Sequence, residues 1–203
     1  KLRVEMRREI KKLHQKLKTT VVYVTHDQTE AMSLGTKIAI MNHGVIQQND
    51  SPENIYNKPS NTFVADFIGR SNFLAVETFS KAASKMAKIE VSGKKMVVAA
   101  HSKAISSSKP VLLVRPESIL VTSAKSRSAK PRKGEGIVEN VVFYGNHVEY
   151  TLDTDEGRII SVVSDPIYDE IVPVGKIAKY SFDPSRAWLL PSQSSQEVSE
   201  SRK

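Results

Sequence analysis

The stretch TVVYVTHDQTEAM, residues 20–32, decides how the first part of the chain is interpreted. Its first half, residues 20–25, is an almost unbroken run of β-branched and aromatic residues, which predicts a strand covered on both faces in a parallel sheet. Its second half predicts a helix, with Asp27 as its capping residue. The polar residues between the two halves therefore lie at the carboxyl edge of a strand, where open α/β sheets bind their ligands.

His26 is the candidate site residue at this edge. An imidazole can hydrogen-bond a phosphate oxygen through one ring nitrogen while the protein holds the other. A single histidine after a strand also serves as a capping or structural residue, so the residue alone leaves both interpretations open.

The residues on either side predict further elements. Upstream, apolar residues at spacings of three and four over residues 2–17 predict an amphipathic helix packed on one side. No cap precedes Lys1, so we expect the chain to start inside a larger domain. Downstream, residues 37–48 predict a short hairpin. Ser51 and Asn61 predict the starts of two helices, and Gly69 predicts a left-handed end to the second.

Beyond residues 69–72 the pattern changes to short β-type runs with Gly, Pro or Asp turns, which favours a small barrel or sandwich. The segment 125–133 lacks apolar periodicity and predicts a mobile surface loop. The predicted strands cover residues 96–99, 111–114, 137–143, 147–152, 159–163, 177–182 and 187–190.

Composition limits the classes of function. The sequence has no cysteine, which excludes disulfides and cysteine-ligated zinc, and no apolar run long enough to cross a bilayer. The net charge is +8, and residues 81–133 hold 13 Lys or Arg against two acidic residues. No aromatic residue lies among these charges to stack bases, which favours a solvated lysine-rich surface and linker over a nucleic-acid site.

Several short motifs of the first 70 residues resemble consecutive landmarks of ATP-binding subunits of ABC importers. They are KLR at the start, YVTHDQ, EA, MNHG, IY and FVADFIG, in the family's order and spacing. The resemblance is to the branch that serves sugars, polyamines and ferric iron, whose subunits add an OB-like regulatory (TOBE) domain. Residues 115–117 (RPE) and 183–187 (DPSRA) are similar to recurring marks of that domain, so the resemblance covers roughly residues 1 to 191.

The resemblance implies an α/β fragment followed by a mainly-β domain. Residues 1–70 would be the carboxyl-terminal part of an ABC nucleotide-binding domain, and residues 71–191 the OB-like TOBE barrel. Residues 192–203 would be a flexible tail.

The resemblance also implies the site and the partners. His26 would be the switch histidine, which contacts the γ-phosphate of ATP bound across a dimer, and so it is both the catalytic and the nucleotide-binding candidate. ATP and Mg²⁺ would serve the complete subunit, and no metal ligand is expected in this chain. Partners would be transmembrane permease subunits, a second copy and, indirectly, a solute-binding protein. The subunit would be cytoplasmic, peripheral on the inner face of the membrane.

Two departures from the family pattern stand out. Thr36-Lys37 replaces the usual Asp-Arg pair. The sequence also lacks a Gly-rich phosphate loop ending in Gly-Lys-Ser/Thr, an LSGGQ-like signature and the acidic pair for magnesium. Because one histidine cannot replace a phosphate cradle, we expect the chain alone neither to bind ATP tightly nor to hydrolyse it.

Two other functions stay open at this point: an OB-like nucleic-acid binder that uses residues 81–133, and a small-molecule-sensing module. Residues 153–157 superficially resemble a calcium loop but lack its later glutamate, so a hairpin turn is expected there. The other histidines lack the spacing of a zinc site, and no serine lies in a Gly-x-Ser-x-Gly turn.

Overall fold

The computed structural model describes residues 2–124 and 130–191, and the chain divides into two compact units between Gly69 and Arg70. The tail expected at residues 192–203, and residues 125–129 of the expected surface loop, lie outside the described residues. No helix of the described residues is long and apolar enough to cross a membrane.

The first unit consists of four helices and one antiparallel hairpin. A small core of Ile38, Ile40, Ile55, Val64 and Ile68 joins the hairpin to its last two helices. In chain order the elements are α1 (Leu2–Leu17), α2 (Gln28–Leu34), β1 (Ile38–Asn42), β2 (Val45–Asp50), α3 (Pro52–Asn57) and α4 (Thr62–Ile68).

The predictions for the first unit that depend on residues close in sequence, its helix caps and its hairpin, are confirmed. Ser51 Oγ accepts the Asn54 amide at 3.3 Å, and Asn61 Oδ1 accepts the Val64 amide at 2.9 Å, so both predicted helix caps are confirmed. The predicted hairpin is confirmed as β1–β2. The predicted left-handed end at Gly69 is wrong, because its φ of 168° is extended backbone.

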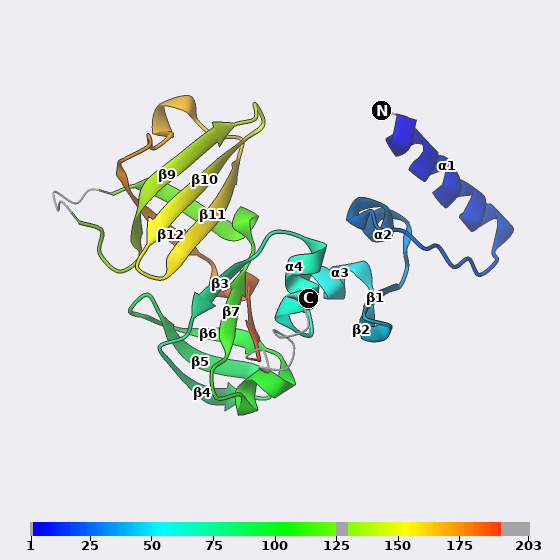
Figure 1. Ribbon diagram of the computed structural model, residues 1–203, viewed down its shortest axis with the longest axis horizontal. Coiled ribbons are helices and arrows are strands. Elements are labelled where there is room, and N and C mark those ends of the chain that lie inside the picture. The colour runs from blue at the N-terminus through cyan, green and yellow to red at the C-terminus, as the bar shows by residue number, and fades with distance from the viewer. Residues whose placement is uncertain (1, 125–129, 192–203) are drawn as a thin grey trace. The chain divides into compact units, whose positions relative to one another are not determined.

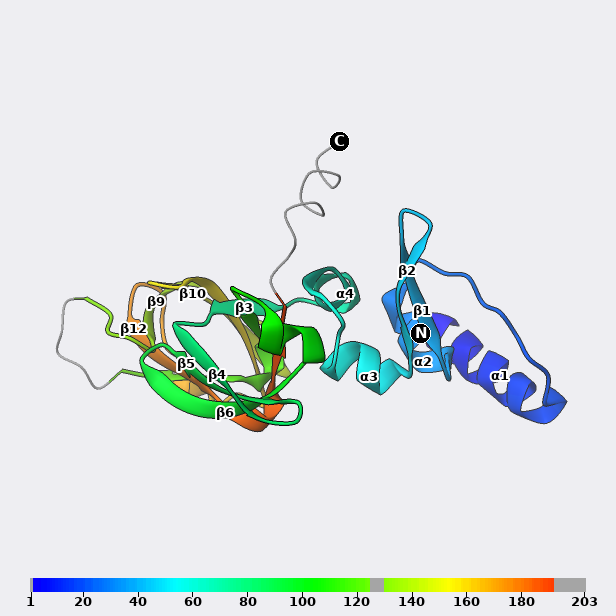
Figure 2. The same ribbon diagram turned by 90° about the horizontal axis from the view of Figure 1, so that it is seen from below.

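The strand predicted over residues 20–25 is wrong. These residues form an extended connection without a strand (Figures 1 and 2), and Val22 and Val24 are 87% and 92% exposed. A strand covered on both faces needs neighbours on both edges, and the described part of this unit offers only the β1–β2 pair. The apolar side of α1 is exposed too, with Leu13 57% and Leu17 60% accessible, so the packing predicted for this helix is absent.

The second unit is mainly β, as predicted, and contains two sheets around one continuous core (Figure 1). The first sheet has six strands in the order β3-β7-β13-β6-β5-β4. Its strands are β3 (Asn72–Ala75), β4 (Thr78–Ala83), β5 (Met86–Val91), β6 (Lys94–Ala100), β7 (Val111–Val114) and β13 (Ala187–Leu190).

The other sheet has five strands in the order β11-β10-β9-β12-β8 and curls until its two edges meet. The strands are β8 (Ile119–Ser123), β9 (Glu135–Phe143), β10 (His147–Thr154), β11 (Gly157–Ser164) and β12 (Ile177–Phe182). Edge strands β8 and β11 lie against each other, and the buried Ser161 hydroxyl donates to the Ile119 carbonyl at 2.6 Å. This closure gives a curled five-stranded sheet of the kind expected for an OB-like domain.

Seven strands agree with the predicted runs, and β3, β4, β5 and β8 were missed. The 153–157 segment is a hairpin turn, as expected, with Thr154 paired to Gly157. Four short 3₁₀ turns complete the unit, at Ser102–Ser106, Pro116–Ser118, Tyr168–Glu170 and Pro184–Arg186.

Buried polar side chains connect the two sheets. Asn72 at the start of β3 donates to the carbonyl of Ile160 in β11 at 2.8 Å and accepts its amide at 2.7 Å. The Ser92 hydroxyl lies 2.9 Å from the Tyr180 hydroxyl, and both bind Glu156. Burial raises the pKa of Tyr180 to about 12, so this phenol stays a neutral hydrogen-bonding group at neutral pH.

Candidate functional site

His26 lies in the turn directly before α2, and its side chain is exposed. Its ring makes no hydrogen bond with any other residue that the structure describes. The next residue, Asp27, caps the helix: its Oδ1 accepts the amides of Thr29 at 2.8 Å and Glu30 at 3.2 Å. The cap predicted at Asp27 is therefore confirmed. The exposed side chain of His26 is accessible to a ligand.

A side-chain network holds the other flank of this turn. Thr25 Oγ1 accepts the Asp27 amide at 2.9 Å and donates to Glu30 Oε2 at 2.8 Å. The Tyr23 hydroxyl donates to the same oxygen at 3.1 Å. Sequence reasoning missed this network. The sequence did contain a signal: Tyr23 and Thr25 are two residues apart, so in an extended segment their hydroxyls lie on the same side.

Gln28 contributes a further hydrogen bond of the first unit. Its Nε2 donates to the carbonyl of Phe67 at the end of α4, far along the chain. The first residue of α2 is therefore attached to the core-forming part of the unit, which fixes the end of α2 next to His26.

Hydrogen bonds and charges around the turn shift the pKa values of Tyr23 and Asp27. The hydrogen bond to Glu30, and then its negative charge, raise the pKa of Tyr23. The amide of Glu30 is the main cause that lowers the pKa of Asp27 below its ordinary value, since hydrogen bonds to a carboxylate favour the ionised form.

The lowered pKa of Asp27 predicts acid sensitivity of the turn. A carboxylate with a folded-state pKa below its unfolded value contributes stability above the unfolded pKa, and this is lost as pH falls through the folded pKa. We expect the Thr29 and Glu30 amides to lose protection from hydrogen exchange below about pH 4. Asp27→Asn keeps a capping oxygen but does not titrate, so the same amides should stay protected at low pH. Equal acid sensitivity in both proteins would contradict the assignment to Asp27.

The residues of this turn could bind a single phosphate oxygen, through His26, but not a whole triphosphate. A free, exposed imidazole before a capped helix suits a phosphate oxygen, because either nitrogen can donate once the ring is oriented. The elements that would surround a triphosphate, a Gly-rich loop and acidic magnesium ligands, are absent from the sequence. No group of three or more potential metal ligands occurs in the described ranges, 2–124 and 130–191.

The remaining histidines do not assemble into a second site. His101 caps a 3₁₀ turn by accepting the Lys103 amide at 3.3 Å, and burial lowers its pKa. His147 stacks on Tyr144 with a centroid distance of 4.8 Å. His14 lies on α1 and His43 in the β1–β2 turn.

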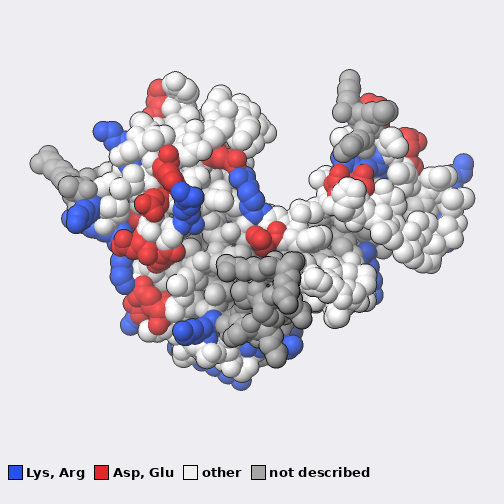
Figure 3. Space-filling view, viewed as in Figure 1, with Lys and Arg blue, Asp and Glu red and all other residues white. Residues whose placement is uncertain are grey.

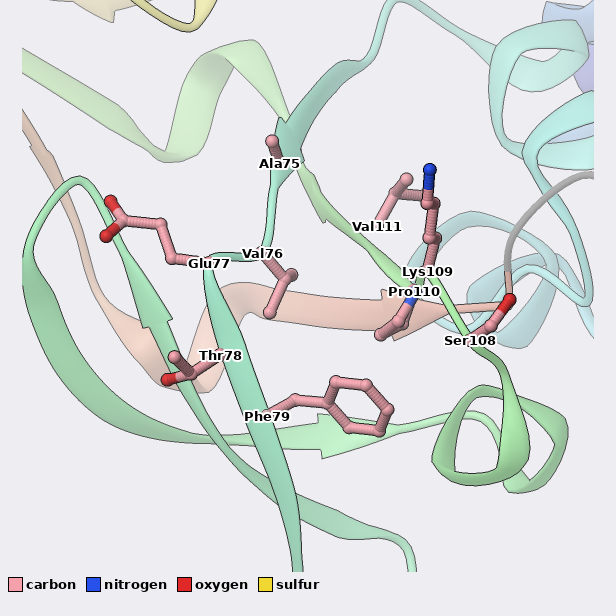
Figure 4. Close-up of a pocket in the computed structure, with 9 residues that line it drawn as sticks. All are labelled: Ala75, Val76, Glu77, Thr78, Phe79, Ser108, Lys109, Pro110 and Val111. Atoms are coloured by element: carbon pink, nitrogen blue, oxygen red, sulfur yellow. The ribbon is translucent and has the colours of Figure 1, made fainter.

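A pocket of about 710 Å³ lies in the second unit, between the β3–β4 connection and the segment leading into β7 (Figure 4). Its apolar lining residues include Val76, Phe79 and Val111. The carboxylate of Glu77 points away from Phe79 and binds Lys133 at 2.9 Å. The pocket is open to solvent, and the Glu77 carboxylate at its rim is already paired with Lys133.

The surface charge of the second unit is mixed on the face shown in Figure 3, where acidic and basic side chains are interspersed. Exposed lysines of residues 81–109 face solvent without aromatic neighbours suited to stack bases. This face has no continuous basic groove of the kind that follows a nucleic-acid backbone.

Comparison with known proteins adds a family match for the second unit. Residues 112–190 match the TOBE domain family. The matched segment starts in β7 and ends at the last residue of β13, so it contains the whole five-stranded curled sheet.

Three relatives match along most of the chain. The osmoprotective compounds uptake ATP-binding protein GgtA of Synechocystis is 39% identical, over 81% of this chain and 46% of the relative. The spermidine/putrescine import ATP-binding protein PotA of Nostoc is 40% identical, over 80% and 43%. The Fe(3+) ions import ATP-binding protein FbpC of Fusobacterium nucleatum is 34% identical, over 86% and 45%. The chain thus spans about half the length of these relatives.

Proposed function

We propose, from the premise that this chain is the carboxyl-terminal portion of an ATP-binding subunit of an ABC importer, that its two units divide energy coupling and regulation between them. Residues 1–70 would complete the nucleotide-binding domain, and residues 71–191 would form the regulatory TOBE domain. Residues 192–203 would follow as a tail.

The observation that carries this proposal is the exposed ring of His26, which makes no hydrogen bond to the described residues. The turn that carries it is held by hydrogen bonds of Asp27 with Thr25 and Thr29. A structural histidine in this position would be expected to hydrogen-bond its own chain, and His26 makes no such bond to residues 2–124 or 130–191. We assign it to the γ-phosphate of ATP, where it would orient the attacking water and respond to loss of the phosphate. In the complete subunit ATP would supply the transferable phosphoryl group, and Mg²⁺ would neutralise its charge.

The exposed apolar surface of the first unit supports a larger domain. Met6, Leu13 and Leu17 on α1, together with Val22 and Val24, are all more than half exposed. Many large apolar side chains exposed close together in the sequence are typical of a surface that another part of the protein covers. We infer that the preceding half of the nucleotide-binding domain covers these residues in the complete subunit and supplies the strands that residues 20–25 lack.

The partners follow from the same premise. The complete subunit would form a homodimer that binds ATP between its copies and would attach to transmembrane permease subunits at the inner face of the membrane. A solute-binding protein would act through the permease. The three relatives are named for three different solutes, so we propose solute import in general and assign no particular solute.

ATP binding tests the proposal in two proteins of different length. The 203-residue chain should show no ATP turnover and no tight binding of a fluorescent ATP analogue, because it lacks the phosphate loop. The complete subunit, expressed with its upstream sequence, should bind the analogue and hydrolyse ATP with Mg²⁺. Turnover by the short chain, or no nucleotide binding by the complete subunit, would overturn the proposal.

A further inference from the structure

The structure assigns Glu30 as the positioning residue for His26, acting through the hydroxyls of Thr25 and Tyr23. This inference rests on the proposed function of His26 and goes beyond it by naming what holds the histidine in place. According to this inference, the position of His26 depends on Glu30 accepting hydrogen bonds through its carboxylate oxygen, rather than on the negative charge of Glu30.

The geometry places anchors on both sides of His26. On one side, Thr25 donates to Glu30 Oε2 at 2.8 Å. On the other side, the Asp27 amide donates to Thr25 Oγ1 at 2.9 Å, and the Asp27 carboxylate accepts the Glu30 amide. Glu30 is therefore bound to both flanks, by its side chain to one and by its backbone to the other. The peptide that carries His26 is closed into a loop of hydrogen bonds.

Tyr23 strengthens this arrangement from the extended segment. Residues 23 and 25 are two positions apart in an extended segment, so their side chains point to the same side. Both hydroxyls donate to the same Glu30 oxygen. The raised pKa of Tyr23 agrees with a phenol held against a carboxylate. The shared direction of these two side chains needs only an extended backbone. Their hydrogen bonds to Glu30 are therefore compatible with residues 20–25 joining a sheet when the rest of the domain is present.

The arrangement matters for a phosphate-sensing imidazole because small errors of position are costly. A catalytic group must be held close to its productive geometry, and its support usually comes from neighbouring hydrogen bonds. The ring of His26 makes no hydrogen bond of its own to the described residues, so its position depends on the backbone between Thr25 and Asp27. Glu30 is the residue that binds both ends of this backbone.

The first test uses the 203-residue chain and amide hydrogen exchange by NMR. Glu30→Ala should speed exchange of the Asp27 amide by about tenfold, since the Thr25 hydroxyl loses its acceptor. Glu30→Gln removes the charge but keeps an acceptor oxygen, and should stay within about threefold of wild type. Glu53→Ala, in the first turn of α3, is the matched control and should leave Asp27 unchanged. An unchanged Asp27 amide in Glu30→Ala, or equal effects of Gln and Ala, would overturn the inference.

The second test uses the complete subunit and separates kcat from KM. Glu30→Ala should lower kcat about tenfold and leave KM for ATP within about twofold, with Glu30→Gln close to wild type. On a His26→Ala background, Glu30→Ala should have no further effect, because residues that act as a unit are not additive. An additive loss would overturn the positioning role. If His26→Ala itself has no effect on kcat while exchange in the short chain responds as expected, the proposed function fails and the hydrogen-bond role of Glu30 stands.

Discussion

In the complete subunit, His26→Ala is expected to lower kcat for ATP hydrolysis by about 100-fold or more, the usual cost of removing one well-placed donor from a charge-stabilising site. The loss should appear in kcat rather than in KM, because the remaining phosphate contacts would come from the upstream half of the subunit. Phosphoryl transfer depends mostly on positioning and electrostatics, so a missing imidazole is not replaced by solvent. Steady-state ATPase kinetics at saturating Mg²⁺ and ATP measure the effect.

His14→Ala is the matched control for this measurement. His14 lies within helix α1, where alanine is the best helix former, so the subunit should keep its kcat within about twofold. A second control is structural: His26→Ala should leave the Thr29 and Glu30 amides of the short chain protected, since the cap belongs to Asp27. A His26→Ala subunit with unchanged kcat would remove this residue from the mechanism.

The features that could be predicted from the sequence are those set by neighbouring residues. The caps at Asp27, Ser51 and Asn61 were predictable because a short polar side chain next to a helical pattern has one favourable partner, the amide two or three residues on. The β1–β2 hairpin and the runs of the barrel were predictable because β-branched residues stand between turn residues. His26 was predicted to lie between a strand and a helix; the helix is confirmed as α2, but the strand is not formed.

Most features that could not be predicted depend on residues far away in the sequence. Residues 20–25 have the composition of a buried strand, but a strand needs pairing partners, and no described strand pairs with these residues. Strand β4 was missed because its sequence, TFSKAA, is mostly exposed and poor in β-branched residues. The Tyr23–Glu30 contact was missed because hydroxyl and carboxylate spacing does not fix side-chain direction until the turn between them is known.

The largest expected loss of stability is that of Asn72→Ala in the second unit. Asn72 is 3% exposed, and its amide group binds both backbone groups of Ile160 on β11 and also donates to the Val114 carbonyl at 3.3 Å. Because β11 is an edge strand of the five-stranded sheet, these bonds satisfy backbone groups that no neighbouring strand pairs. Alanine would leave the partly buried amide and carbonyl of Ile160 and the carbonyl of Val114 without this partner at the junction of the two sheets.

The free energy of unfolding should fall by about 3 kcal/mol, since each unsatisfied buried polar group costs roughly 1–3 kcal/mol. Urea unfolding followed by tryptophan fluorescence measures it, because Trp188 is the only tryptophan of the sequence and lies in β13 of this unit. Asn140→Ala is the matched control: Asn140 is an exposed residue of β9, and its loss should change stability by less than about 0.5 kcal/mol. Similar small effects of both substitutions would show that Asn72 does not join the sheets. A large effect of Asn72→Ala alone would identify this side chain as one of the connections that hold the curled sheet against the six-stranded one.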